Sequence, residues 1–203
     1  MVRAAILVSG GGTLFQSVLD SMYFGEIPDF QLVAVICTEA NEYTLRRAKN
    51  AGVEAFVVEP EDFPTRLSYS MAISNKLKDM DIDLVIIAGY SMPLGVISAQ
   101  FRKRIIGVYP ALVPAFAGTG EDPVKAALDR GCKLTGATAY FADIDGNLGP
   151  IIAQQAVEIR PDDTPDTLSR RILEEAQWRL LPKAVKLFCE NRLEIHGDTV
   201  VIK

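Results

Sequence analysis

The chain has 203 residues, of which 49% are hydrophobic and 23% charged, and its net charge is -5. This length suits one α/β domain with a full core and is too short for two domains of ordinary size, so we expect a single domain over residues 1–203. The composition excludes a disordered or fibrous chain. The negative charge argues against nucleic acid or an anionic membrane surface as a partner and favours small ligands.

Three cysteines, Cys37, Cys132 and Cys189, lie far apart and form no CxxC pair. This number and spacing indicate neither a disulfide framework nor a zinc site, so we expect no metal and a reducing, cytoplasmic environment. The apolar run that follows Met1 ends at Gly10 and is too short for a signal peptide or a membrane span. It is typical of a first β-strand.

Short apolar runs recur through the first half of the chain and are rich in Val, Ile and Leu, as in strands buried on both faces. They cover Ala4–Val8, Leu32–Cys37, Ala55–Val58, Leu84–Ala88 and Ile105–Val108. Apolar residues recur at helical spacings in the segments Thr13–Tyr23, Glu42–Ala51 and Arg66–Met80. Strands that alternate with helices predict an α/β fold: a Rossmann-like, mostly parallel twisted sheet with flanking helices. Ligands of such sheets bind beyond the carboxyl ends of the strands.

The second half of the chain shows a different pattern. Strand-like segments at Thr135–Ala142 and Ile151–Val157 are separated by a turn-rich stretch, which predicts a hairpin that extends the sheet. Apolar periodicity over Thr164–Glu190 predicts helix. The chain closes with Leu193–Ile195, a turn and Val200–Ile202, which we interpret as a C-terminal hairpin.

A glycine-rich loop, Ser9–Thr13, lies between the first predicted strand and the first predicted helix. Unpaired amides and the helix dipole favour an anion at this place, so the loop predicts a phosphate site. The loop has neither the Lys of a Walker A sequence nor the GxGxxG spacing, and a tight turn without a ligand is an equally good interpretation of the loop alone.

Two later segments, taken with this loop, resemble one family. Residues 107–116 read GVYPALVPAF and residues 143–152 read DIDGNLGPII. The glycinamide ribonucleotide formyltransferases carry Asn-x-His-Pro-Ser-Leu-Leu-Pro-x-Phe/Tyr and Asp-x-Gly-Pro at these places. The similarity runs essentially end to end and includes Ala88–Tyr90, Thr135–Thr138, Gln154–Val157, Asp163–Pro165 and Leu180–Leu193. The chain is therefore identified as a divergent member of that family, with a formyltransferase fold.

The resemblance implies a reaction and its ligands. Family members transfer a formyl group from the cosubstrate 10-formyltetrahydrofolate to the amine of glycinamide ribonucleotide, a step of purine biosynthesis. By resemblance, the phosphoribosyl substrate or its phosphate would meet Gly10, Gly11, Gly12, Thr13, Leu14, Pro110 and Gln177. The folate would meet Met92, Pro93, Leu94, Ala142, Asp143, Ile144 and Gly146.

All three positions that the resemblance makes catalytic are substituted. The Asn that steadies the developing oxyanion is Gly107, the His is Tyr109, and the Asp that orients the His is Asn147. Tyrosine titrates near pH 10 and Asn does not titrate, so neither suits acid–base chemistry at neutral pH. Gly107 offers no side-chain donor, and losing one oxyanion-hole donor costs about a hundredfold or more in rate. We therefore expect little of the family's chemistry.

Substitute groups are an alternative. Asp143 or Asp145 with a raised pKa could replace the base, and Glu121 and Asp122 also lie on loops expected near the cleft. Acidic residues in polar loops are more often solvated turn formers. The only histidine, His196, falls in the terminal turn, where it is poorly placed for the cleft.

Three functions follow, in order of preference. The first is an inactive or very slow relative that keeps ligand binding and has a sensing, regulatory or assembly role. The second is an active folate-dependent enzyme with an acidic-loop base or another substrate, and the third is formyl transfer by positioning alone. Tyr109 either donates to an oxyanion or fills the vacated imidazole space. We expect Gly10–Thr13, Tyr109 and Asn147 to converge on one cleft; a homodimer and a monomer are both open.

Overall fold

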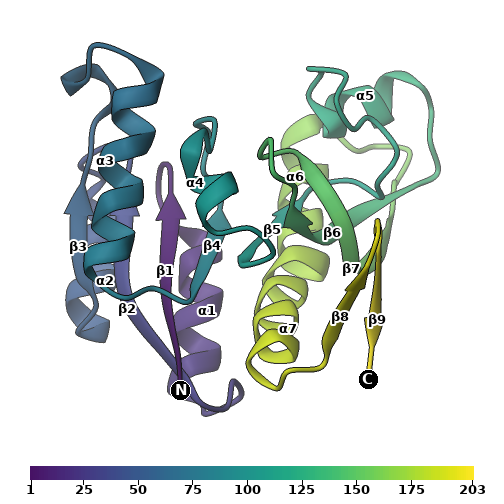
Figure 1. The fold of residues 1–203 in the computed structure, drawn as a ribbon. Coiled ribbons are helices and arrows are strands. Elements are labelled where there is room, and N and C mark those ends of the chain that lie inside the picture. The colour runs from purple at the N-terminus through teal and green to yellow at the C-terminus, as the bar shows by residue number, and fades with distance from the viewer.

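A nine-stranded sheet runs through residues 1–203 of the computed structural model (Figure 1), with the order β3-β2-β1-β4-β5-β6-β7-β9-β8. Its strands are β1 (Val2–Val8), β2 (Phe30–Cys37), β3 (Glu54–Val57), β4 (Leu84–Ala88), β5 (Ile105–Tyr109), β6 (Leu134–Ala142), β7 (Leu148–Glu158), β8 (Leu193–His196) and β9 (Thr199–Ile202). The helices are α1 (Thr13–Tyr23), α2 (Glu42–Ala51), α3 (Arg66–Asp79), α4 (Val96–Gln100), α5 (Pro123–Asp129), α6 (Pro165–Ile172) and α7 (Trp178–Cys189), with the short turns η1 (Pro60–Asp62) and η2 (Leu173–Gln177).

The first five strands are parallel, as the alternation of strands and helices predicts. β1 pairs with β2 and β4, β2 pairs with β3, and β4 pairs with β5. The antiparallel strands β6 and β7 extend this sheet, and the β8–β9 hairpin joins it where Thr199 pairs with Ile151. The predicted mostly parallel sheet and both predicted hairpins are confirmed.

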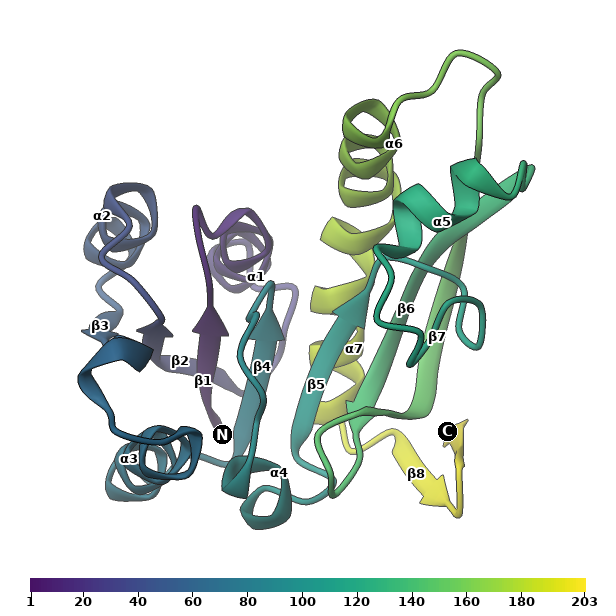
Figure 2. The same cartoon turned by 90° about the horizontal axis from the view of Figure 1, so that it is seen from above.

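Helices cover both faces of the sheet (Figure 2). Alternate residues of β1 enter different cores: Ile6 packs with the cluster that contains Phe15 and Leu181, and Leu7 packs with the cluster that contains Ile73. α1, α2 and α7 therefore lie over one face, and α3 and α4 lie over the other. Burial of the parallel strands on both faces explains their nearly continuous apolar sequence.

The helices differ from the sequence prediction in two ways. α4 and α5, of 5 and 7 residues, were not predicted, because so short a segment shows no clear helical period. The helical stretch predicted over Thr164–Glu190 is interrupted by the π-helical turn η2, where the backbone winds more widely before α7 begins. Its start is as expected: Thr164 accepts a hydrogen bond from the amide of Thr167 at 3.3 Å in a capping box.

Candidate functional site

Neighbouring side chains hold the glycine-rich loop through its carbonyl groups. The Thr44 hydroxyl donates to the Gly10 carbonyl oxygen at 2.7 Å, and Arg47 Nε donates to the Gly11 carbonyl oxygen at 3.3 Å. Gly12, which precedes α1, provides no side-chain cap for the helix. The first amides of a helix have no partner within the helix, so the loop offers N–H groups to an anion.

Gly10 and Gly12 both have a positive φ, and Gly12 is the one where a side chain would also clash. Its φ of +67° lies in the left-handed region, and a Cβ there would stand 2.7 Å from Thr44 Oγ1. Gly11 has open space around its missing side chain and no positive φ. The two neighbouring glycines therefore differ sharply in what they tolerate.

Ser9 connects the glycine-rich loop to the loop after β4. Its hydroxyl oxygen accepts hydrogen bonds from Thr38 Oγ1 at 3.0 Å and from the Ser91 amide at 3.1 Å, and its amide donates to the Gly89 carbonyl oxygen at 3.2 Å. Two loops at the carboxyl end of adjacent strands are thus joined. This is the edge at which the fold predicts a ligand.

The two segments predicted to meet folate also lie against each other. A Cβ at Gly146 would stand 3.1 Å from Leu94 Cβ, and the Ser98 hydroxyl on α4 donates to the Ile144 carbonyl oxygen at 2.7 Å. Met92 is half-buried and Pro93 exposed, whereas Ala142 is buried at the end of β6. The structure therefore brings these segments together.

At the middle of β5, the ring of Tyr140 from β6 occupies the space that a side chain at Gly107 would need. Gly107 pairs with Tyr140 on β6, and a Cβ at Gly107 would stand 2.7 Å from the Tyr140 hydroxyl oxygen. Tyr140 is buried, and burial together with the nearby Tyr109 raises its pKa to about 12. A neutral phenol can donate a hydrogen bond but is a poor base at neutral pH.

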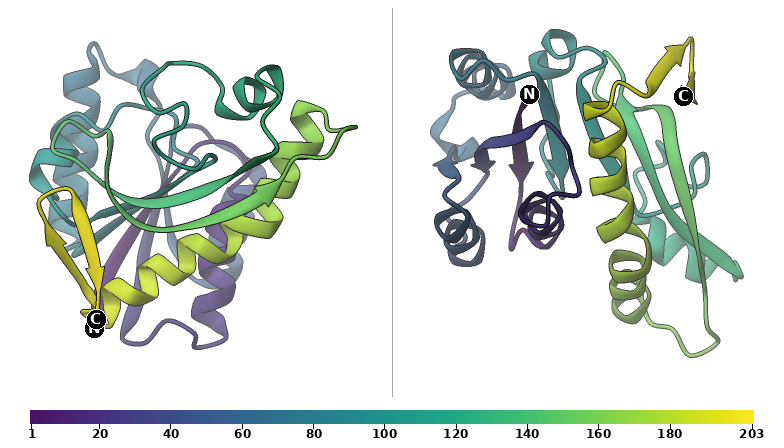
Figure 3. Two further views of the ribbon diagram at one scale, coloured as in Figure 1. Left: turned by 90° about the vertical axis from the view of Figure 1, so that its right-hand side faces the viewer. Right: turned by 90° about the horizontal axis from the view of Figure 1, so that it is seen from below.

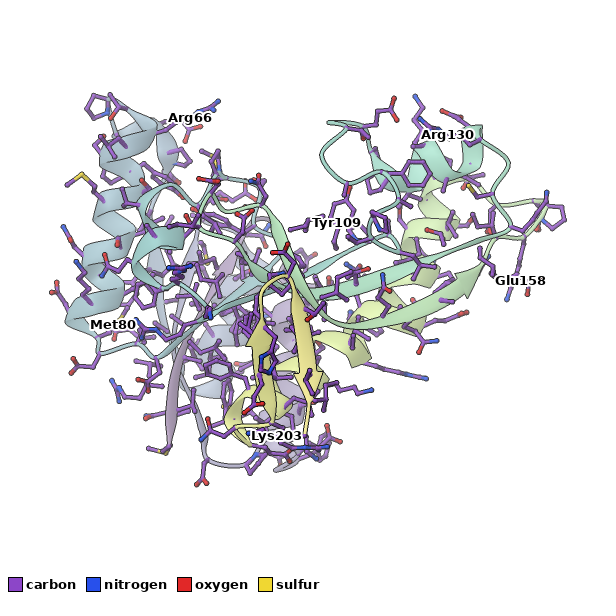
Figure 4. All side chains as sticks on the ribbon, turned by 45° about the vertical axis from the view of Figure 1, so that its right-hand side comes forward. Arg66, Met80, Tyr109, Arg130, Glu158 and Lys203 are labelled. Atoms are coloured by element: carbon purple, nitrogen blue, oxygen red, sulfur yellow. The ribbon has the colours of Figure 1, made fainter.

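Tyr109, the last residue of β5, is hydrogen-bonded to the loop that follows it and leads to α5 (Figure 4). Its hydroxyl donates to the Phe116 carbonyl oxygen at 3.2 Å. Burial, with a smaller contribution from Asp122, raises the pKa of Tyr109 above its usual value. Tyr109 therefore supplies no proton acceptor at neutral pH.

The acidic loop is held by its own first carboxylate. Asp143 accepts hydrogen bonds from the amides of Asp145 at 2.9 Å and Asn147 at 2.7 Å, and Asn147 Nδ2 lies 3.4 Å from the same carboxylate. The strand register places this turn beside the start of β5, whereas Tyr109 lies at its end. No hydrogen bond joins Asn147 to Tyr109. The prediction that these two residues converge on one cleft therefore has no support from a direct contact.

The other loop carboxylates have structural partners or lie exposed. Asp122 caps α5 by accepting from the amides of Val124 at 2.8 Å and Lys125 at 3.1 Å. Glu121 lies 3.7 Å from Arg130, and Asp145 is exposed. This geometry gives no support to a substitute base at these positions.

The remaining predicted substrate residues contribute little side-chain surface. Leu14 is 7% exposed and belongs to the core, so it could contact a ligand only through its backbone amide. Gln177 is 8% exposed and ends the η2 turn, and Pro110 is half-buried after Tyr109. A polar ribose contact at Leu14 is therefore absent.

Sequence reasoning missed three residues of this region. Thr44 and Arg47 lie on α2 and hold the loop after β1, a pairing that no local pattern indicates. Tyr140 had a signal, because a glycine inside a strand, here Gly107, often marks the close approach of another group. His196 lies where the sequence placed it, exposed in the terminal hairpin and 3.5 Å from Glu194.

No three His, Cys, Asp or Glu side chains are grouped so as to hold a metal ion, and the three cysteines are free. No helix has the length and apolar character needed to cross a bilayer.

Comparisons with known proteins agree with the resemblance. A family model described as "Formyl transferase" matches residues 2–185. The phosphoribosylglycinamide formyltransferase of Haemophilus influenzae is 31% identical over 199 residues, which cover 98% of this chain and 92% of that protein. The solved structure of glycinamide ribonucleotide transformylase 1 from Symbiobacterium toebii is 39% identical with a TM-score of 0.94, over 100% of this chain and 94% of the other. A formyltetrahydrofolate deformylase from Burkholderia mallei is 26% identical with a TM-score of 0.86, over 100% of this chain and 70% of the other.

Proposed function

The chain belongs to the formyl transferase family, and from this premise we propose that it is a ligand-binding relative of the glycinamide ribonucleotide formyltransferases that transfers formyl groups very slowly or not at all. Its ligand is a phosphoribosyl compound whose phosphate binds the amides of Gly10–Thr13. The folate 10-formyltetrahydrofolate lies between Met92–Leu94 and Ala142–Gly146 when it binds. Its role is regulatory or sensory.

One observation carries this proposal: the ring of Tyr140 fills the space that a side chain at Gly107 would need. Formyl transfer requires a donor for the developing oxyanion and a group that accepts the proton of the attacking amine. Gly107 has no side-chain donor, and the raised pKa values of Tyr109 and Tyr140 keep both hydroxyls protonated at neutral pH. Neither tyrosine is therefore a proton acceptor at neutral pH, and Asp122, the carboxylate whose charge reaches Tyr109, is engaged in capping α5.

Phosphate binding does not depend on these residues. It rests on backbone amides at the start of α1, while the Thr44 and Arg47 side chains hold the loop through its carbonyl groups. Loss of catalytic side chains is therefore compatible with retained binding, and this supports a binding role over a general loss of function.

The test is the wild-type turnover of 10-formyltetrahydrofolate with glycinamide ribonucleotide. We expect a rate at least about a thousandfold below a kcat of roughly 1 per second, together with calorimetric binding of ribose 5-phosphate. A kcat on the order of 1 per second would refute the proposal. If that rate collapsed in Asp145→Asn, the acidic loop would be the catalytic base.

A further inference from the structure

Three adjoining hollows follow α1 on the face of the sheet that carries α2 and α7. The first, of about 470 Å³, lies between α1 and α2, and the second, of about 460 Å³, shares Gln16, Asp20 and Arg47 with it. The third, of about 430 Å³, shares Ser21 and Trp178 with the second and continues along α7. The right panel of Figure 3 shows α1 between α2 and α7. We name these joined hollows the α1 groove.

The α1 groove gathers the exposed aromatic side chains of the protein. Tyr23, Tyr43 and Trp178 line it and are 85%, 59% and 39% exposed, and the ring of Phe24, 72% exposed, packs 5.3 Å from that of Tyr23. These four are the only aromatic residues among the exposed large hydrophobic side chains. Exposed apolar patches and clusters of Trp, Tyr and Arg mark protein interaction sites.

The charge of the α1 groove is opposite to that of the whole protein. Its lining contains five positive side chains, Arg46, Arg47, Arg179, Lys183 and Lys186, against two negative ones, Asp20 and Glu26, although the chain carries a net charge of -5. Both carboxylates are already engaged, since Asp20 accepts from Gln16 at 2.8 Å and Glu26 from Ser21 at 2.7 Å.

Most of these cations are available to a partner. Of the five, only Lys186 has a carboxylate within ion-pair distance, Glu190 at 3.9 Å. The Arg46 guanidinium lies 5.6 Å from the centre of the Tyr43 ring, which combines positive charge and aromatic surface at one end of the groove. At the other end of the groove, Trp178 and Arg179 again place an aromatic ring next to a positive charge in the sequence.

We propose that the α1 groove binds an acidic peptide segment of a partner protein. Apolar side chains of the peptide pack on Tyr43 and Trp178, and its carboxylates face Arg46 and Lys183. Complementary charge favours this partner over a neutral peptide. Nucleic acid is disfavoured because two carboxylates interrupt the cations and the protein as a whole is negative.

The α1 groove also touches the glycine-rich loop. Arg47 lines the groove and at the same time donates to the Gly11 carbonyl oxygen. Thr13, the last residue of the loop, lines the second hollow, so the docking surface meets the phosphate loop at Thr13 and Arg47.

The single tryptophan of the chain makes the test direct, because Trp178 lies in the α1 groove. The probe is a synthetic 12-residue peptide of glutamate with leucine and phenylalanine at intervals, titrated while Trp178 fluorescence and binding heat are measured. The references are the same peptide with lysine for glutamate and a 12-nucleotide uridine RNA. We expect saturable binding of the acidic peptide, with a Kd at least about tenfold below that of either reference.

Charge reversal locates the binding. Arg46→Glu with Lys183→Glu should weaken the acidic peptide at least about tenfold, because two attractions become repulsions. The control, Arg66→Glu with Lys78→Glu, makes the same change in net charge at exposed positions of α3 on the opposite face of the sheet and should leave the Kd unchanged. Absence of binding by both measurements, equal or tighter binding of the lysine peptide or the RNA, or an unchanged Kd in the groove variant would each overturn the proposal.

Discussion

The two halves of the molecule use their polar side chains differently. In the parallel half, Thr44 and Arg47 bond to carbonyl groups of the glycine-rich loop, and the amides of Gly10–Thr13 stay free. In the antiparallel half, which we count from β5 because β5 pairs antiparallel with β6, the groups that could do chemistry are engaged in structure: Asp143 closes its own turn, Asp122 caps α5, and Tyr109 holds Phe116.

This difference shows which parts of a site survive substitution. An anion site made of backbone amides depends on the path of the chain, which the fold maintains. A catalytic site depends on particular side chains with suitable pKa values, and these can be lost while the fold is kept. The comparison therefore separates binding, which we assign to the parallel half, from catalysis, which we assign to neither half.

The largest expected effect is a loss of stability on changing Asp163, a carboxylate whose pKa is strongly lowered by its hydrogen bonds from Arg171. Asp163 accepts two hydrogen bonds from Arg171, the longer at 2.6 Å, and others from the Arg160 amide and the Thr167 hydroxyl, and its side chain is 2% exposed. Asp163→Asn should lower the free energy of unfolding by about 3 kcal/mol, since it leaves Arg171 largely buried without its charge partner. Denaturant unfolding measures the loss.

The pH dependence of this loss has a definite sign. The hydrogen bonds from Arg171 hold the pKa of Asp163 well below its usual range, so its contribution is complete above the unfolded-state pKa of about 4 and falls as the pH drops below that value. The difference between wild type and Asp163→Asn should therefore shrink below about pH 4. The exposed neighbour Asp162, replaced in Asp162→Asn, is the control and should change stability by less than about 0.5 kcal/mol. Equal losses in the two variants would contradict this account of the antiparallel half.

The second prediction tests binding in the parallel half. Gly12→Val should weaken ribose 5-phosphate about a hundredfold, or about 2.7 kcal/mol, because a β-branched residue at φ +67° is strained and meets Thr44 Oγ1. Calorimetry gives the affinity. Gly11→Ala tests folding of the loop and should keep wild-type stability, because its Cβ enters open space. Unchanged binding in Gly12→Val would remove the loop from the site.

Much of the fold could be predicted because the spacing of apolar residues along short segments indicates each helix or strand. The bounds of α1 and α2 coincide with the predicted ones, since their apolar spacing ends at clear breaks, and the bounds of β4 coincide for the same reason. The η2 turn could not be predicted, because one wide turn barely changes an apolar pattern. Its position matters for the site, because Gln177, one of the predicted substrate residues, is the last residue of this turn.

The candidate site was predictable in position more than in detail. The resemblance located Gly107, but the partner that fills its side-chain space, Tyr140, depends on how β5 and β6 pair. Asp143 accepts hydrogen bonds from the amides of its own turn, and the sequence of residues 143–147 alone does not determine that turn conformation. Long-range register and loop conformation are what the sequence pattern lacked.

The third prediction is that restoring the family residues in the antiparallel half fails. The triple variant Gly107→Asn, Tyr109→His and Asn147→Asp should give weak formyl transfer or none, and lose about 1–3 kcal/mol of stability, because the side chain introduced in place of Gly107 would meet the Tyr140 ring. Adding Tyr140→Ala removes the clash but also deletes a buried ring of the core, so it should not restore wild-type stability. Steady-state turnover and denaturant unfolding measure both effects. An ordinary turnover in the triple variant would show that the family's site is intact apart from three side chains.

The smallest effect is expected at Tyr109, and it distinguishes a structural from a catalytic hydroxyl. Tyr109→Phe removes one 3.2 Å hydrogen bond to the Phe116 carbonyl oxygen and keeps the ring, so stability should fall by about 1 kcal/mol or less. For a chain of this size such a loss lowers Tm by about 2–4 °C, which scanning calorimetry resolves. Affinity for ribose 5-phosphate should not change, because the glycine-rich loop lies in the other half, and any trace turnover should be equal in the two proteins. If the trace turnover of the wild type instead disappeared in Tyr109→Phe while stability held, the Tyr109 hydroxyl would be donating to a reacting oxygen. The antiparallel half would then retain chemistry of its own.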